Sequence, residues 1–170
     1  SYITRISSEQ DAVTDFVAQH IKDPVLAGFW IGKLSRAREL GVQLSLSSDS
    51  FVPRLENVDF TNDLVTSIGN LVDNAMEALA DNSRRHVEVL LLYDEGHLQI
   101  EVQDTGPGIP SELWKNIFEK GFSTKAHDRG FGLALVRKVL DRREGTLTFD
   151  SALQHGTTFR IAIPYEEVEK

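Results

Sequence analysis

The sequence predicts an α+β fold of two layers, with helices packed against a sheet that contains antiparallel strand pairs. The first indication is that segments with helical periodicity alternate along the chain with segments whose apolar residues recur at every second position. The second is the turn Asp94-Glu95-Gly96, which joins two such alternating segments into a hairpin. With 170 residues, 41% of them hydrophobic, the chain can bury one main domain with a small appendage.

The N-terminal 40 residues are expected to be helical. Residues 8–21 carry an apolar stripe behind Ser8, a candidate N-cap. Asp23 and Pro24 then fit the N-cap and first residue of a second helix, which ends at Gly41. Its apolar residues recur every three or four positions: Leu26, Trp30, Leu34, Ala37 and Leu40. This stripe fits equally a helix packed on its own domain and a helix in an intermolecular bundle.

Helices and strands alternate through the rest of the chain. Each is assigned from its periodicity and from the Gly, Pro, Asp and Ser residues that bound it. The expected elements are a strand at 42–46, a helix at 61–80, hairpin strands within 87–104, a short helix from Ser111 to Phe118, a polar loop, a helix at 131–141, and strands at 145–150 and 157–163.

Composition excludes several classes of function. Without cysteine, the chain has no disulfide or thiolate metal site, which fits a reducing compartment. A net charge of −8 argues against a nucleic-acid surface, so an anionic ligand needs a local site and a metal. The apolar runs are too short to span a bilayer, and no signal peptide is visible. Because the chain starts without an initiator Met, we expect a fragment of a longer protein.

The helix expected at 61–80 carries two asparagines, Asn70 and Asn74, one turn apart. On a helical wheel they lie opposite the apolar arc, beside Asp63, Asp73 and Glu77. Taken alone, this pattern is that of a solvated polar face. A functional interpretation requires a ligand for that face.

Two glycine-containing segments supply such a ligand site. In "DTGPGIP" (104–110), Gly106 and Gly108 permit positive φ and close backbone approach, and Asp104 can accept a hydrogen bond from an exocyclic amine. In "RGFGLAL" (129–135), Gly130 and Gly132 precede an apolar helix whose free N–H groups suit phosphates. Each segment alone is also compatible with an ordinary turn, and the second is neither a P-loop nor a complete GxGxxG.

Between them, "NIFEKGFSTK" (116–125) combines aromatic anchors with groups that can reach a phosphate. Phe118 and Phe122 can hold the loop to the body, while Ser123, Thr124 and Lys125 supply hydroxyls and a positive charge. A solvated loop is the alternative for this segment alone. The four segments together can bind a metal, a purine and a phosphate chain.

In this order, "NLVDNA", "DTGPGIP", "IFEKGFSTK" and "GFGLAL" resemble the ATP-binding domain of the histidine kinase, gyrase, Hsp90 and MutL superfamily, over roughly residues 42–165. The resemblance implies a Bergerat-type α/β sandwich, a mixed β-sheet with helices on one face, that binds Mg-ATP beneath a mobile lid at residues 119–130. It also implies a role for each site residue. Asn74 would ligate Mg²⁺, Asn70 would support the phosphates or a metal-bound water, and Asp104 would contact the adenine amino group. The other cofactor-binding residues would be Gly106, Gly108 and Ile109 around the base, Phe122, Ser123, Thr124 and the catalytic Lys125 in the lid, and Gly130, Phe131, Gly132 and Leu133 at the phosphates.

The resemblance also separates subfamilies. Hydrolysing members carry a water-activating Glu where this chain has Asn70, and an amide cannot act as a general base. Asn there is typical of histidine kinases, in which transfer to an imidazole rests on positioning and charge neutralisation. The segment 24–46 resembles the second dimerisation helix and first strand of citrate and C4-dicarboxylate sensor kinases. We therefore expect a partial dimerisation segment at 1–40 and a catalytic ATP-binding domain at 41–170.

Several partners follow from the same resemblance. The phosphoacceptor His would lie on a helix missing from this chain, in the same or a partner subunit, because His20 reads as structural. A response regulator would act downstream, and the chain would be cytoplasmic, attached to a membrane only through missing parts of its parent. Many histidine kinases carry Lys and Tyr where Glu77 and Ala78 stand, so Lys125, Lys120 or Arg129 would compensate. The alternatives are a hydrolysing ATPase of the same fold and a non-enzymatic nucleotide-binding or dimerisation module.

Overall fold

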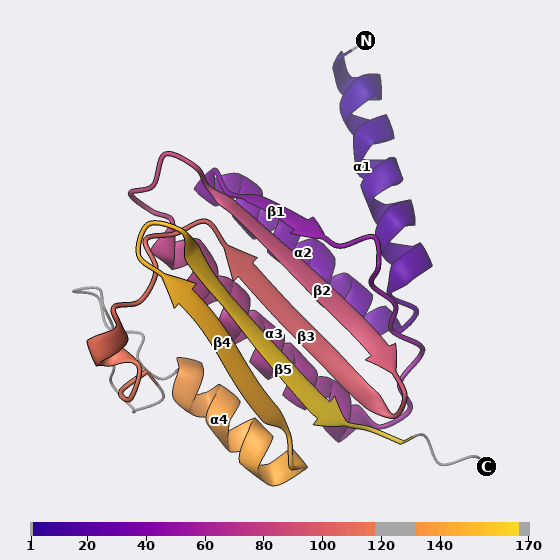
Figure 1. Ribbon diagram of the computed structural model, residues 1–170. Coiled ribbons are helices and arrows are strands. Elements are labelled where there is room, and N and C mark those ends of the chain that lie inside the picture. The colour runs from indigo at the N-terminus through magenta and orange to yellow at the C-terminus, as the bar shows by residue number, and fades with distance from the viewer. Residues whose placement is uncertain (1, 118–131, 167–170) are drawn as a thin grey trace.

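The computed structural model describes residues 2–117 and 132–166 as a mixed sheet covered on one face by helices (Figure 1). The helices are α1 (Tyr2–His20), α2 (Pro24–Leu40), α3 (Val58–Ala78), a 3₁₀ turn η1 (Ser111–Leu113) and α4 (Gly132–Arg143). The strands are β1 (Gln43–Leu46), β2 (His86–Asp94), β3 (His97–Asp104), β4 (Thr146–Ala152) and β5 (Gly156–Pro164).

The sheet has the order β1-β2-β3-β5-β4. β1 pairs with β2 in parallel, and the other neighbours are antiparallel. Burial alternates along the central strands: Val87 and Val89 face the helices, whereas Glu88 is exposed between them. Figure 1 shows α2, α3 and α4 on the covered face. The expected two-layer α+β fold with a mixed sheet is confirmed.

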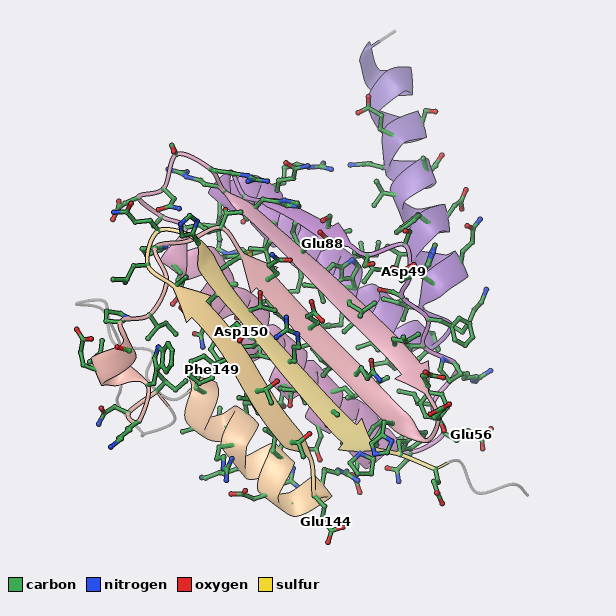
Figure 2. The ribbon with its side chains drawn as sticks, viewed as in Figure 1. Asp49, Glu56, Glu88, Glu144, Phe149 and Asp150 are labelled. Carbon is green, nitrogen blue, oxygen red and sulfur yellow. The ribbon has the colours of Figure 1, made fainter. Side chains whose placement is uncertain are left out.

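The uncovered face of the sheet is polar. Figure 2 shows Glu88 and Asp150 on this side. Arg160 on β5 lies between two acidic side chains, 2.6 Å from Asp150 and 3.5 Å from Glu101. Exposed ion pairs of this kind add little stability. The polar side chains are therefore explained by the contact of this face with solvent.

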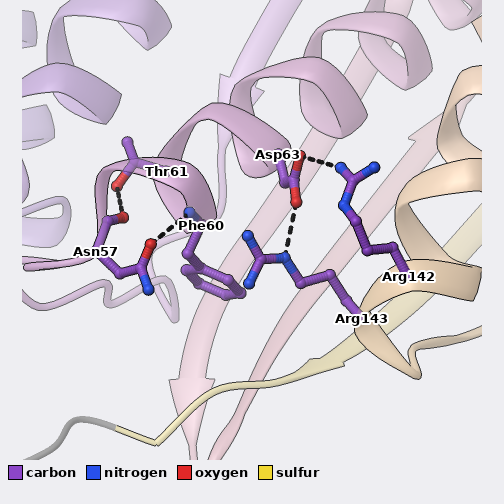
Figure 3. Close-up of polar contacts among 6 residues, drawn as sticks. All are labelled: Asn57, Phe60, Thr61, Asp63, Arg142 and Arg143. Carbon is purple, nitrogen blue, oxygen red and sulfur yellow. Dashed lines mark hydrogen bonds and ion pairs between the residues drawn. The ribbon is translucent and has the colours of Figure 1, made fainter.

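The central helix α3 follows the predicted apolar arc, with Leu64, Ile68 and Leu71 fully buried. It begins earlier than the expected residue 61, because Asn57 caps it: its Oδ1 accepts a hydrogen bond from Phe60 N at 3.0 Å (Figure 3). The helix is thereby extended by a turn toward the C-terminal end of β5.

Helix α2 has the caps that the sequence predicts. Asp23 Oδ1 accepts a hydrogen bond from Leu26 N at 3.0 Å, and Gly41 ends the helix at φ 70°. Trp30 is buried against the core, and Lys33 Nζ contacts Asp73 on α3 at 2.7 Å. Helix α2 therefore packs on its own domain, while the assignment of residues 1–40 to dimerisation stays a prediction.

A ladder of backbone hydrogen bonds ties the α1–α2 junction to the sheet. The loop after β1 lies beside both β2 and the junction, as two parallel bridges, Ile21 with Val52 and Phe51 with Leu92. Its bonds run from Lys22 N to Val52 O (2.7 Å), Val52 N to His20 O, Phe51 N to Leu91 O, and Tyr93 N to Phe51 O (each 2.8 Å). The base of α1 is thus held by main-chain groups, while its other end extends away from the sheet (Figure 1).

Three local expectations are wrong. Helix α1 begins at Tyr2, so Ser8 lies inside it and is no N-cap. Ser111 does not cap a helix to residue 118: the segment is a single 3₁₀ turn whose cap position is Pro110, without a side-chain cap bond. Helix α4 runs two residues beyond the expected residue 141. Among the described residues, no helix has the length and apolar character needed to cross a membrane.

Candidate functional site

The candidate site lies where the end of β3 meets the C-terminal half of α3, and α4 packs along the same helix. The loop after β3 is placed against α3 by Gly106: a Cβ there would lie 3.5 Å from the Cβ and the carbonyl oxygen of Ala78. Ala78 is one turn beyond Asn74 on the same helix. The base-contacting loop and the metal-binding position expected from the sequence are therefore brought together.

Asp104, the last residue of β3, is a buried carboxylate at the base of this loop. Its Oδ1 accepts a hydrogen bond from Gly106 N at 2.8 Å. Burial raises the pKa of Asp104 above its ordinary value, against backbone hydrogen bonds from Gly106 and Thr157 that lower it. A carboxylate fixed in this way is an oriented acceptor for a donor group of a ligand.

The β4–β5 turn holds the glycine loop from the other side. Gly108 has φ 80°, and a Cβ there would lie 2.4 Å from the carbonyl oxygen of Ala152. Ile109 N donates to Ser151 Oγ at 2.7 Å, and Gln154 N donates to Pro107 O at 2.8 Å. Gly108 is thus required by close backbone packing, and two hydrogen bonds hold the loop against the β4–β5 turn.

Sequence reasoning missed the partners of this loop on β5. Gly156 has φ 89°, and a Cβ there would lie 2.0 Å from the carbonyl oxygen of Asp104. Thr157 is buried beside it and pairs with Asp104 across the strands, and its hydroxyl lies 2.9 Å from that of Ser151. A glycine between two strand-like segments was the available signal, but its partner is 52 positions away in sequence.

Asn70 and Asn74 are half-buried on α3. Asn70 Nδ2 donates to the carbonyl oxygen of Thr66 at 2.7 Å, which fixes its amide on the helix surface. Two acidic residues on the same side of α3 form ion pairs with neighbouring helices. Asp73 pairs with Lys33 of α2, and Asp63 pairs with arginines of α4. The polar face of α3 is therefore covered in part by neighbouring helices, at Asp73 by α2 and at Asp63 by α4.

Helix α4 begins at Gly132, and Leu133 is half-buried. The N–H groups of a first helical turn have no partner within the helix, and it is here that the sequence predicts phosphate contacts. The remaining predicted residues lie outside the described part of the chain: Phe122, Ser123, Thr124, Lys125, Gly130 and Phe131, together with Lys120, Arg129 and the lid at 119–130. Within residues 2–117 and 132–166, no cluster of three or more His, Asp or Glu side chains is arranged to hold a metal.

The mixed sheet with helices on one face and a buried carboxylate at the end of β3 agrees with the ATP-binding fold expected from the four segments. The chain belongs to the family of histidine kinase-, DNA gyrase B-, and HSP90-like ATPases, whose sequence profile matches residues 61–167. The family expected from the four segments is thereby confirmed. Its members are ATPases, so ATP is the ligand class of this domain.

Curated relatives include sensor kinases of the branch expected from residues 24–46. The chain is 38% identical over 165 residues to the sensor histidine kinase DcuS of Escherichia coli K12, covering 97% of this chain. It is 40% identical over 167 residues (96% of this chain) to a probable C4-dicarboxylate sensor kinase of Halalkalibacterium halodurans. It is 36% identical (95% of this chain) to the sensor histidine kinase CitA of Klebsiella pneumoniae. The chain spans 30%, 31% and 30% of the lengths of these three proteins.

Solved histidine kinase domains share the fold. The catalytic domain of the histidine kinase ThkA matches with a TM-score of 0.62 at 24% identity, over 81% of this chain and 88% of that one. The mycobacterial sensor histidine kinase MprB matches with a TM-score of 0.59 at 25% identity, over 82% and 93% of the two chains. The individual site residues stay predictions, and their roles are taken up below.

Proposed function

We propose that this chain is the ATP-binding catalytic portion of a two-component sensor histidine kinase. It binds Mg-ATP and transfers the γ-phosphoryl group to a histidine on a helix outside this chain. The observation that carries the proposal is Asn70, a half-buried amide one turn before Asn74. A hydrolysing enzyme needs a carboxylate in this place to activate water, whereas phosphoryl transfer to an imidazole needs a positioned acceptor and neutralised charge.

Adenine recognition is assigned to Asp104 and the loop around it. The adenine amino group donates to the buried carboxylate, while Gly106 and Gly108 leave room for the ring and Ile109 packs against it. Because the loop is already clamped by the β4–β5 turn, little ordering is needed when the base binds.

The metal is assigned to Asn74. Mg²⁺ prefers hard oxygen ligands and commonly uses few protein ligands together with substrate phosphates, so a single amide oxygen beside the phosphate chain suits it. When bound, Mg²⁺ neutralises phosphate charge. Asn70 supports the phosphates, and Gly132 and Leu133 offer backbone N–H groups at the start of α4. Lys125 is the candidate cation, and Phe122, Ser123, Thr124, Gly130 and Phe131 complete the expected contacts.

The remaining assignments extend the relatives' two-component role to this chain. Residues 1–40 contribute part of a dimerisation segment, and residues 41–170 form the catalytic domain. The phosphoacceptor helix belongs to the same or a partner subunit, a response regulator receives the phosphoryl group, and the chain works in the cytoplasm.

The test supplies Mg-ATP labelled at the γ-phosphate together with a separate domain that carries a phosphoacceptor His. Acid-labile label on the added domain, and none on the chain incubated alone, is the expected result. Steady phosphate release without an acceptor would instead favour the hydrolysing ATPase. Tight Mg-ATP binding with no labelling of any acceptor domain would favour the non-enzymatic module.

A further inference from the structure

One carboxylate on α3 is clamped by two arginines of α4 (Figure 3). Asp63 Oδ1 lies 2.5 Å from Arg142 Nη2, and Asp63 Oδ2 lies 2.7 Å from Arg143 Nε. The Asp63 side chain is only 13% exposed, and that of Arg143 is 24% exposed. Both carboxylate oxygens are thus used, and the contact is shielded from solvent more than an ordinary surface pair.

Two aromatic side chains, Phe60 and Tyr165, pack beside the arginine part of the clamp. The guanidinium of Arg143 lies 5.3 Å from the centre of the Phe60 ring, which stacks on Tyr165 at 4.1 Å. Asp63 and Phe60 stand one turn apart on α3, so one turn of this helix holds both the charged and the aromatic part of Arg143. Both arginines lie in the last turn of α4, where positive charge is favoured.

The position of the clamp sets the axial register of α4 relative to α3. Helices α3 and α4 run in opposite directions (Figure 1), and α4 packs more extensively on α3 than on the sheet. Asn74 lies eleven positions after Asp63 on α3, and Arg143 lies eleven positions after Gly132 on α4. Each interval is a rise of about 16 Å, so pairing at Asp63 brings the first turn of α4 level with Asn74.

We propose that Asp63 is a positioning residue for the phosphate chain of the nucleotide. It touches no nucleotide atom itself. By pairing with Arg142 and Arg143 it sets the register in which the first-turn N–H groups of α4 face Asn74. The inference rests on the proposed function and adds a residue to which neither the resemblance nor the sequence pattern gives a role in the site.

Loss of the clamp should weaken binding of the phosphate chain and leave binding of the base unchanged. Asp104, its glycine loop and the β4–β5 turn make no use of the clamp, so adenosine should not sense it. In Asp63→Asn, the Kd for Mg-ATP is expected to rise about threefold to tenfold, with the Kd for adenosine unchanged. Calorimetry gives the first value and an NMR titration of adenosine the second. Asp59→Asn removes an exposed carboxylate one turn earlier on α3 and is expected to alter neither.

Equal weakening of both ligands in Asp63→Asn would overturn the inference, because it would indicate general damage to the fold. Unchanged binding of both would overturn it as well. Should Asp63→Asn fail to fold, Arg142→Gln is the alternative variant, because Arg142 is 59% exposed and its loss removes half of the clamp. A smaller rise in the Kd for ATP, with the Kd for adenosine unchanged, is then expected. No rise in the Kd for ATP would refute the inference. If the unmodified chain binds no ATP, the proposed function itself fails.

Discussion

Replacing Asp104 by Asn is a test of base recognition that keeps the shape of the side chain. The oxygen of the new amide can still accept from Gly106 N, now 2.8 Å from Asp104 Oδ1. The other carboxylate oxygen becomes an NH₂ group. A donor then faces the adenine amino group, which is also a donor, so the contact is lost and replaced by a repulsive one.

The magnitude follows from the kind of bond removed. A hydrogen bond to a charged group contributes about 1.5–3 kcal/mol, so ATP affinity should fall roughly tenfold to 150-fold. Guanine carries a carbonyl where adenine carries the amino group, and the new NH₂ can donate to it. GTP binding should therefore improve in Asp104→Asn while ATP binding weakens, which reverses or removes the preference between the two.

Calorimetric titration of Mg-ATP and Mg-GTP against both proteins measures this ratio. Asp94→Asn, an exposed carboxylate at the far end of the same hairpin, serves as the matched control and should leave the ratio unchanged. Thermal melts verify that each variant is folded. An ATP-to-GTP ratio equal to that of the parent would refute the assignment of Asp104 to the base.

Three further predictions concern pH, glycine packing and the metal. At pH values between the ordinary Asp pKa of 3.8 and the raised pKa of Asp104, this carboxyl is protonated more in the folded than in the unfolded chain. Its contribution to the free energy of unfolding therefore falls as pH rises through that window. Urea titrations at several pH values should show this slope in the parent and not in Asp104→Asn. Gly156→Ala should lower Tm well below that of Gly96→Ala: both glycines have positive φ, but a Cβ at Gly156 meets a backbone oxygen at 2.0 Å and one at Gly96 meets open space. Asn74→Ala should abolish the dependence of ATP affinity on Mg²⁺, whereas Asn62→Ala, exposed on the same helix, should preserve it.

Each has a contrary outcome. Parallel pH profiles for Asp104→Asn and the parent would mean that this carboxyl does not titrate differently on folding. Equal Tm values for the two glycine variants would mean that the β5 contact relaxes at no cost. An Asn74→Ala protein that still binds ATP more tightly with Mg²⁺ than with EDTA would move the metal to another ligand.

What the sequence could predict depended on local interactions. The caps of α2, the hairpin turn at residues 94–96 and the buried arc of α3 are decided by residues within one or two turns of each other, so their patterns are readable. The order of the four segments added the family and the outline of the site. The predictions for Ser8 and Ser111 are wrong because a serine before an apolar run looks the same in sequence in three places. It can be an N-cap, an interior residue of a longer helix, as Ser8 is, or part of a tight turn, as Ser111 is.

What the sequence could not predict depended on contacts between distant segments. A helical wheel shows Asp63 as one more polar residue, since its arginine partners are 79 and 80 positions away. Gly156 is likewise meaningful only once β5 lies beside the end of β3. Taken alone, the helical wheel indicates a solvated polar side of α3, because periodicity separates apolar from polar faces but does not identify the polar partners that neighbouring helices supply.

The ladder at the base of α1 is made of backbone N–H and C=O groups, so no particular side chain is needed to form it. Substitutions at the exposed ladder positions Lys22 and Phe51 can therefore accumulate without breaking the link, provided that proline does not remove a donor, whereas Ile21 and Val52 are also buried in the core. A shift of the last turn of α1 would act on β2 through amide groups whose spacing is common to all residues. The coupling between that helix and the sheet can consequently be shared by relatives whose sequences differ at the exposed positions of the ladder.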